Sequence, residues 1–267
     1  MAKAALAPPE VPGDIRLMNL TALLLGVIGA VAIAAAGVIW LTQLRAFAVK
    51  SIRIDGDLAH NSVLTIRANA MPKLAGNFFT LDLVAGRRAF ESVPWVRQAI
   101  VQRVWPNRLA VHLEEHRAVA LWIDAARGDE AADKLVNSYG EVFEANVGDV
   151  EDDALPTLLG PDGSSAHALT MLGRVETALA PLAARVEQLS LSGRGSWQAT
   201  LDSGAVVELG RGSDDEVIAR AGRFVVTLPQ VTGRYQRPLA YADLRHTDGY
   251  AVRLKGVSTT ADKPNKK

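Results

Sequence analysis

Two histidines and an adjacent pair of glutamates come closest in this sequence to a metal-binding or catalytic pattern. His112 and His116 are four residues apart, a spacing that on a helix would let both imidazoles bind one metal ion. They fall in a strand-like stretch, however, and no H-E-x-x-H pattern accompanies them. Glu114 and Glu115 are neighbours, and neighbouring strand residues point to opposite faces. We therefore expect neither a metal site nor a carboxylate pair acting on one bond.

Other motifs that support catalysis are missing from the sequence. There is no G-x-S-x-G nucleophile elbow and no G-x-x-x-x-G-K-[ST] phosphate loop. A G-R-G triplet occurs at 193–195 and at 210–212, near strand ends, but neither makes a dinucleotide fingerprint, and both are expected to be turns. The absence of cysteine excludes disulfides and thiolate metal sites. An anchored hydrolase is the enzymatic alternative, but we expect a protein without enzymatic activity, cofactor or small-molecule substrate.

Charge and hydropathy divide the chain of 267 residues into two unlike parts. The 29 basic and 29 acidic residues balance, so nothing favours a nucleic-acid partner. No charged residue lies between Arg16 and Arg45, and Leu20 to Leu41 contain only Thr21 as a clearly polar residue. A run of about 20 apolar residues spans a bilayer. The sequence therefore predicts a transmembrane helix over 19–44, followed by a part of ordinary soluble composition.

A cleavable signal peptide is the main alternative for this apolar run. Residues 32–34 resemble a cleavage site with small residues, but the run continues through Trp40 and Leu41. An apolar signal-peptide region is usually only about 7–15 residues long. We therefore expect the segment to be kept as an anchor.

Residues 46–116 have the pattern of a small domain with the element order β-α-α-β-β. Two stretches have apolar residues at helical spacing, and Asn61 or Ser62 could cap the first and Thr80 the second. The turn chemistry of 105–108 joins the last two strands in a hairpin. The strands are predicted at 49–54, 96–104 and 109–114.

Residues 117–256 predict a second domain that is rich in strands and carries two helices. The helices are expected at 165–184, where Pro181 would end or kink the first, and at 214–228. Strands are predicted at 135–137, 140–143, 186–191, 197–201, 205–209, 239–245 and 250–254. We expect residues 257–267 to form a disordered tail.

Several short motifs in this order resemble the FtsQ/DivIB cell-division family. They are P-W-V at 94–96, V-W-P-N-R-L at 104–109, H-L-E-E-H at 112–116, A-L-W at 120–122, G-E-V-F at 140–143, L-P-T-L at 155–158 and Y-A-D-L-R at 241–245. Arg117 stands where the family often has proline, and Asn137 where it usually has aspartate. The resemblance also implies a loop over 155–161. The element order after a membrane segment resembles a POTRA domain. The fold class is then α+β: a single N-terminal transmembrane helix, a POTRA domain over 46–116, and a second mixed antiparallel-sheet domain with helices over 117–256.

The resemblance implies a non-enzymatic divisome scaffold in the bacterial inner membrane, at the division septum. Lysine and arginine counts on the two sides of the span do not set its direction, but long domains translocate largely regardless of charge. We expect residues 1–18 to be a disordered cytoplasmic tail and the C-terminal part to be periplasmic. The alternative function is that of a POTRA-containing membrane protein of an export or secretion system.

The resemblance also implies partners. In the family, FtsB in complex with FtsL docks on the C-terminal strand region, and other divisome membrane proteins are further partners. The resemblance implies that the scaffold links early and late cell-division proteins and helps to control septal wall synthesis. A last strand at a sheet edge can accept a partner strand through main-chain hydrogen bonds. Carried over to this chain, the partner surface comprises Arg245, His246, Asp248, Gly249, Tyr250, Ala251, Val252 and Arg194.

Individual members of this set have alternative interpretations. Arg245 suits a partner carboxylate, whereas His246 stands where the family often has tyrosine. Tyr250 could instead pack across the hairpin. The family places an arginine just before its Ser-Trp pair, where this chain has Gly195, so Arg194 would have to reach over it. Trp197 is expected to lie in the core.

Overall fold

The computed structural model describes residues 13–42, 47–56, 58–74, 76–125, 134–246 and 249–256. The predicted tail at 257–267 and most of the one at 1–18 lie outside these residues. Contacts divide the chain into two compact units, which are described separately. The first comprises Met1–Asp57, Ser62–Val93 and Gln98–Leu113, and the second Leu58–Asn61, Pro94–Arg97 and Glu114–Lys267.

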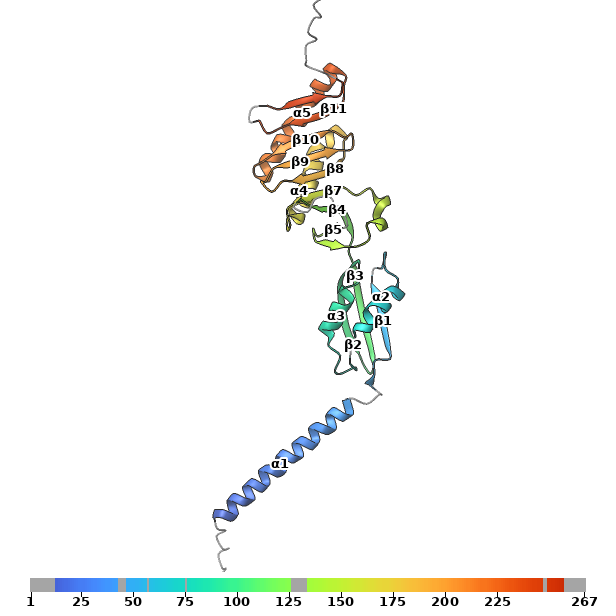
Figure 1. Ribbon diagram of the computed structural model, residues 1–267, viewed down its shortest axis with the longest axis vertical. Coiled ribbons are helices and arrows are strands. Elements are labelled where there is room, and N and C mark those ends of the chain that lie inside the picture. Colours follow the sequence, from blue (N-terminus) through green and yellow to red (C-terminus); the bar gives the residue numbers. More distant parts are fainter. Residues whose placement is uncertain are drawn as a thin grey trace, which may run out of the picture. The chain divides into compact units, whose positions relative to one another are not determined.

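The predicted apolar helix is confirmed as α1, Gly13–Thr42 (Figure 1). Within it, Leu17–Thr42 is long and apolar enough to cross a membrane, and none of this segment is buried within the protein. The helix begins at Gly13, before the predicted start at Asn19. Asp14 lies in its first turn, where the positive end of the helix dipole favours a carboxylate.

The first unit contains the predicted β-α-α-β-β order (Figure 1). Its elements are β1 (Ser51–Gly56), α2 (Val63–Ala70), the 3-10 helix η2 (Met71–Lys73), α3 (Leu83–Glu91), β2 (Val96–Val104) and β3 (Arg108–Glu115). The strand order is β1-β3-β2. β1 pairs in parallel with β3, from Ser51 opposite Arg108 to Gly56 opposite Leu113. The two edges of this sheet are therefore β1 and β2.

The helix caps in this unit agree only in part with the predicted ones. The Ser62 hydroxyl accepts the Thr65 N–H at the start of α2, as one of the two predicted caps would. Thr80 was the wrong residue for α3, because its hydroxyl accepts the N–H of Asn77 in the preceding turn. Asp82 caps α3 instead, and its carboxylate accepts the first free N–H groups of the helix.

The second unit is built on one mixed sheet that contains nine strands among the described residues. Its elements are β4 (Ala118–Asp124), β5 (Lys134–Asn137), β6 (Val142–Glu144), η4 (Val147–Asp153), β7 (Thr157–Gly160), α4 (Ser165–Leu179), η5 (Ala180–Leu182), β8 (Val186–Leu191), β9 (Trp197–Leu201), β10 (Val206–Gly210), α5 (Asp214–Tyr235), β11 (Leu239–Asp243) and β12 (Ala251–Leu254). The spatial order is β12-β11-β10-β9-β8-β7-β4-β5-β6. The pairs β4–β7, β7–β8 and β10–β11 are parallel, so the predicted mixed sheet is confirmed.

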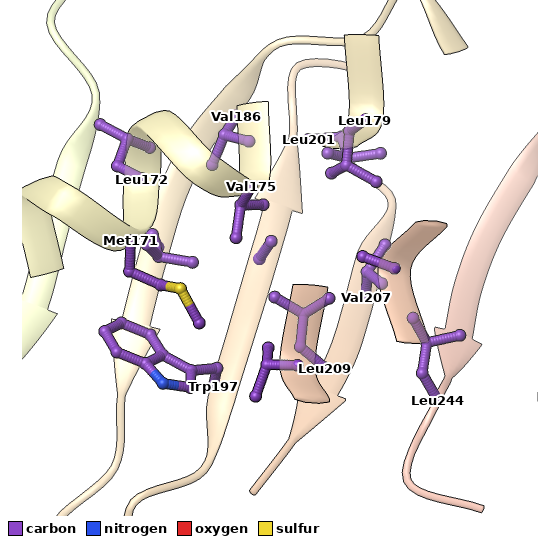
Figure 2. Packing of buried hydrophobic residues seen from close by; sticks show 14 of the residues in the cluster. Met171, Leu172, Val175, Leu179, Val186, Trp197, Leu201, Val207, Leu209 and Leu244 are labelled. Carbon is purple, nitrogen blue, oxygen red and sulfur yellow. The ribbon is translucent and has the colours of Figure 1, made fainter. Parts of the chain in front are cut away.

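The core of this unit lies between the sheet and the helices α4 and α5, which contact each other and the strands. Figure 2 shows Met171 and Val175 of α4 facing Trp197, Val207 and other strand residues. Residues on this face of β9 are buried and alternate with half-buried polar ones, as expected for a strand with one covered face. The prediction that Trp197 belongs to the core is confirmed, since only 2% of it is exposed.

Three predicted features of the second unit differ from the structure. Residues 157–160 form strand β7 inside the sheet rather than a loop, and Leu158 is fully buried there. α5 continues through Pro229 to Tyr235, because Val231 still packs on the core. β12 begins at Ala251, so Tyr250 precedes the strand instead of opening it. Pro181 does end α4, in the short helix η5.

Candidate protein-binding site

Strand β12 is one edge of the nine-stranded sheet, as the sequence predicted for the last strand. It pairs with β11 on one side only, and no strand lies on its other side among the described residues. The Lys255 N–H bonds to the Pro238 carbonyl on the β11 side. Because backbone direction alternates along a strand, the N–H groups of Val252 and Leu254 point to the free edge. This edge can therefore donate main-chain hydrogen bonds to an added strand.

Tyr250 lies at the start of this edge but packs inward. Its ring meets Phe224 of α5 edge-on, with 5.1 Å between the centroids. Its hydroxyl lies 2.7 Å from the Thr227 hydroxyl, at hydrogen-bond distance. The ring also packs against the core of the second unit. Tyr250 thus fixes the β11–β12 connection to α5, which matches the alternative interpretation of this residue.

Arg245 leaves the end of β11 and is held by a carboxylate two residues earlier. Its Nε donates to Oδ1 of Asp243 at 2.8 Å and its Nη2 donates to Oδ2 at 2.6 Å. These hydrogen bonds lower the pKa of Asp243 from 3.8 to about 2, against the opposing effect of burial. A β carbon on Gly210, whose φ is +82°, would lie 2.9 Å from Cγ of Arg245. Glycine at 210 therefore leaves room for the arginine stem.

A cleft of about 320 Å³ opens between α5 and the β11–β12 connection. Its lining is Arg220, Arg223, Thr227, Leu244, His246, Gly249 and Tyr250. Arg220 donates to the carbonyl oxygens of Leu209 and Arg211, while Arg223 is exposed. Neither arginine forms an ion pair with any described residue. This basic cleft, as we call it, therefore favours a carboxylate from outside the chain.

The strand register places Arg194 at the same end of the sheet. Arg194 lies in the β8–β9 turn, three residues before Trp197, which is opposite Gly210 of β10. β10 runs parallel to β11, so the ends of both strands point the same way as this turn. Arg194 is exposed and has no ion-pair partner in the described part of the chain. It shares the sheet end with Arg245, although strand β10 lies between the β8–β9 and β11–β12 hairpins.

The eight predicted residues therefore differ in position. Arg245, His246 and Gly249 are exposed at the sheet end, Ala251 and Val252 form the edge, and Arg194 flanks them. Tyr250 is mainly internal, and Asp248 lies outside the described residues. Sequence reasoning missed Arg220, Arg223 and Thr227. Their spacing of three and four residues on a predicted helix was the signal that they share one face.

The histidine and glutamate pattern in the second unit serves packing and hydrogen bonding. Glu115 accepts the backbone N–H groups of Ala59, His60 and Asn61 at 2.8–3.0 Å. Glu114 instead accepts from Arg97, so the two glutamates bind different groups, as expected. His112 contacts Asp55 in the first unit, apart from this set.

Arg97 and His116 complete this network. Arg97 bridges Glu114 and Glu141 and lies over the Tyr139 ring, 3.8 Å from its centroid. The hydrogen bond from Arg97 is the main cause that lowers the pKa of Glu141. His116 stacks on Phe143 with 4.0 Å between centroids. Among the described residues, no group of three or more His, Cys, Asp or Glu side chains could hold a metal ion.

These features define a class of protein with an apolar N-terminal helix, a small β-α-α-β-β domain and a mixed sheet with an open terminal edge. The match to known families covers both domains. Residues 47–116 match the model of the POTRA domain, FtsQ-type, and residues 120–245 match that of the cell division protein FtsQ/DivIB, C-terminal. The chain belongs to the FtsQ/DivIB family of cell division proteins.

Similar whole proteins support this membership. The chain is 41% identical over 250 residues to the cell division protein FtsQ of Burkholderia pseudomallei, covering 93% of this chain and 96% of that protein. It is 39% identical over 252 residues to FtsQ of Thiomonas arsenitoxydans, covering 94% and 91%. Agreement across both domains favours a cell-division protein over the alternative of an export component. With its apolar helix, family membership indicates a membrane-anchored protein.

Proposed function

We propose that this protein is a non-enzymatic scaffold of the divisome. It binds FtsB and FtsL through the β12 edge and the basic cleft beside it. It lies in the bacterial inner membrane at the septum, with its N-terminus cytoplasmic and both folded domains periplasmic. Through these contacts and others with divisome membrane proteins, it joins early and late cell-division proteins and helps to control septal wall synthesis.

The observation that carries this proposal is the free edge of β12. A partner strand placed there gains main-chain hydrogen bonds from the outward N–H groups of Val252 and Leu254, and it continues the sheet. Exposed edges of this kind are usually blunted in proteins that do not use them. The adjacent arginines supply charge that selects an acidic segment.

The test is the affinity of the full-length protein, in detergent or nanodiscs, for the FtsB–FtsL complex of the same cell. Val252→Pro removes the outward N–H, whereas the N–H groups that bond to β11 stay. We expect this variant to bind at least about tenfold more weakly, since several edge bonds depend on a regular strand.

Val252→Ala is the matched control, because it also shortens the half-buried side chain but keeps the N–H. It should bind within about twofold of the unchanged protein. Equal binding by both variants would contradict strand addition at β12. Loss of binding in the alanine variant would instead assign the affinity to the side chain.

A further inference from the structure

A second groove lies in the first unit, far from β12 in the sequence. It has a volume of about 510 Å³ and opens between residues 48–52 and the helices α2 and η2. Leu81 and Leu109 line it and are almost completely buried, and Ile52 and Met71 also border it. The groove therefore offers an apolar surface beside the strand β1.

The strand beside this groove is also an edge. β1 pairs only with β3, and no further strand lies beyond it in the part of the chain that the structure describes. Its side chains alternate, with Ser51 and Arg53 exposed and Ile52 and Ile54 half-buried. An extended peptide could thus pair with the backbone of β1 while its alternate side chains enter the groove.

The charged residues of the groove indicate which charge a bound peptide would have. Lys50 and Arg67 both line the groove and are exposed. Neither forms an ion pair with a described residue, and no aspartate or glutamate lines the groove. An acidic peptide would therefore meet two uncompensated cations.

Chain connectivity keeps this groove near the membrane segment. Lys50 lies eight residues after Thr42, the last residue of α1. Fully extended, this connection spans at most about 28 Å. A partner segment that directly follows or precedes a membrane span can therefore reach the groove. A segment farther from its own membrane span would need a longer linker.

We propose that the groove binds an extended, acidic segment next to the membrane span of a second membrane protein. The segment adds to β1 as a strand, places apolar side chains over Leu81 and Leu109, and sets a carboxylate against Lys50 and Arg67. The groove belongs to the first unit and the β12 edge to the second, so the two sites share no residue.

The test uses the full-length protein in cell membranes, with the photoreactive residue p-benzoylphenylalanine in place of Ser51. The same residue at Gln102, which is exposed on the opposite edge strand β2, is the positional control. Cross-linked peptides are identified by mass spectrometry. We expect adducts at position 51, and none of the same peptide at position 102, with an acidic segment that adjoins a membrane span.

Charge variants decide whether the adduct depends on the groove. Lys50→Glu with Arg67→Glu should lower its yield at least about fivefold, because two attractions become repulsions. Lys50→Arg with Arg67→Lys keeps both charges and should restore it. Both side chains are exposed, so the thermal unfolding of the variants should match that of the unchanged protein.

Three outcomes would overturn the proposal. They are adducts at position 51 with lipid alone or with no protein, adducts with a segment that has no acidic residue, and a yield that charge reversal leaves unchanged. Adducts with lipid alone would assign the two cations to the membrane surface.

Discussion

The carboxylate of Asp243 holds the guanidinium of Arg245 through two parallel hydrogen bonds, 2.8 Å from Nε to Oδ1 and 2.6 Å from Nη2 to Oδ2. The Arg245 backbone N–H also donates to Oδ1, at 3.0 Å. The pair lies at the end of β11, next to the open edge of β12. Its hydrogen bonds fix the orientation of the Arg245 side chain relative to the sheet. The Arg245 side chain remains 55% exposed, so a partner can still reach it.

The first prediction concerns the stability that this pair provides. Asp243 has a lowered pKa, from 3.8 to about 2, so its contribution is complete above about pH 3.8 and is lost as the pH falls toward 2. Asp243→Asn should cost at most about 1 kcal/mol near neutral pH, less than the full shift implies, because Arg245 is half exposed to solvent.

Urea unfolding of the protein and the variant at several pH values measures this difference. The two stabilities should converge as the pH falls below about 3.8. A difference that stays constant down to the lowest pH would show that the ionised pair is not its source.

The second prediction separates the internal role of Tyr250 from partner binding. Tyr250→Phe removes the hydroxyl that meets Thr227 but keeps the ring on Phe224. Thr227 still donates to carbonyls of its own helix, so the cost should be about 0.5–1.5 kcal/mol. Affinity for FtsB–FtsL should stay within about twofold. A large loss of affinity with little loss of stability would instead place the hydroxyl in the interface.

The third prediction tests the basic cleft. Arg223→Glu should weaken FtsB–FtsL binding by about tenfold, and more at low salt, since a cation that has no ion-pair partner among the described residues becomes an anion. Arg223→Lys should retain most of the affinity. Arg234→Glu makes the same charge change on α5 outside the cleft and serves as the control. Equal effects of the changes at 223 and 234 would indicate only a general dependence on net charge.

The fourth prediction is that His116 makes the folded protein less stable when the pH becomes mildly acidic. Oδ1 of Asn137 accepts the N–H groups of Tyr139 and Glu141, so its Nδ2 must be the donor toward Nδ1 of His116, 2.9 Å away. Protonated Nδ1 would oppose that donor. Partial burial is the main cause that lowers the pKa of His116 below 6.5.

The direction in which the stability changes with pH follows from the lowered pKa of His116. The unfolded chain takes up a proton at His116 before the folded chain does, so stability falls as the pH drops below about 6.5. His116→Phe keeps a ring on Phe143 but cannot titrate, so its stability should change less between about pH 7.5 and pH 5.5. Unfolding curves at the two pH values measure this. Equal slopes for both proteins would exclude His116 as the source.

The sequence predicted the features that depend on neighbouring residues, and it missed features that depend on contacts between distant segments. Local signals predicted a cap at Asn61 or Ser62, the hairpins and the apolar helix, because each depends on nearby residues. Strand β7 was missed because it is only four residues long, Thr157–Gly160, and begins directly after Pro156, while its neighbours in the sheet come from distant segments.

The site shows the same limit. The edge position of β12 could be inferred from its place at the end of the folded chain. The basic cleft could not, because Arg220 and Arg223 reach the β11–β12 connection only once α5 packs across the sheet. Tyr250 also reads as a strand residue until its contacts with Phe224 and Thr227 are seen.

Amide hydrogen exchange at β12, in the full-length protein with and without FtsB–FtsL, tests the central claim most directly. In the free protein, the outward N–H groups of Val252 and Leu254 should exchange faster than that of Lys255, which bonds to Pro238. On binding, exchange at Val252 and Leu254 should slow by at least about tenfold, as each N–H gains a strand partner. Unchanged exchange at these two amides in a saturated complex would contradict strand addition at this edge.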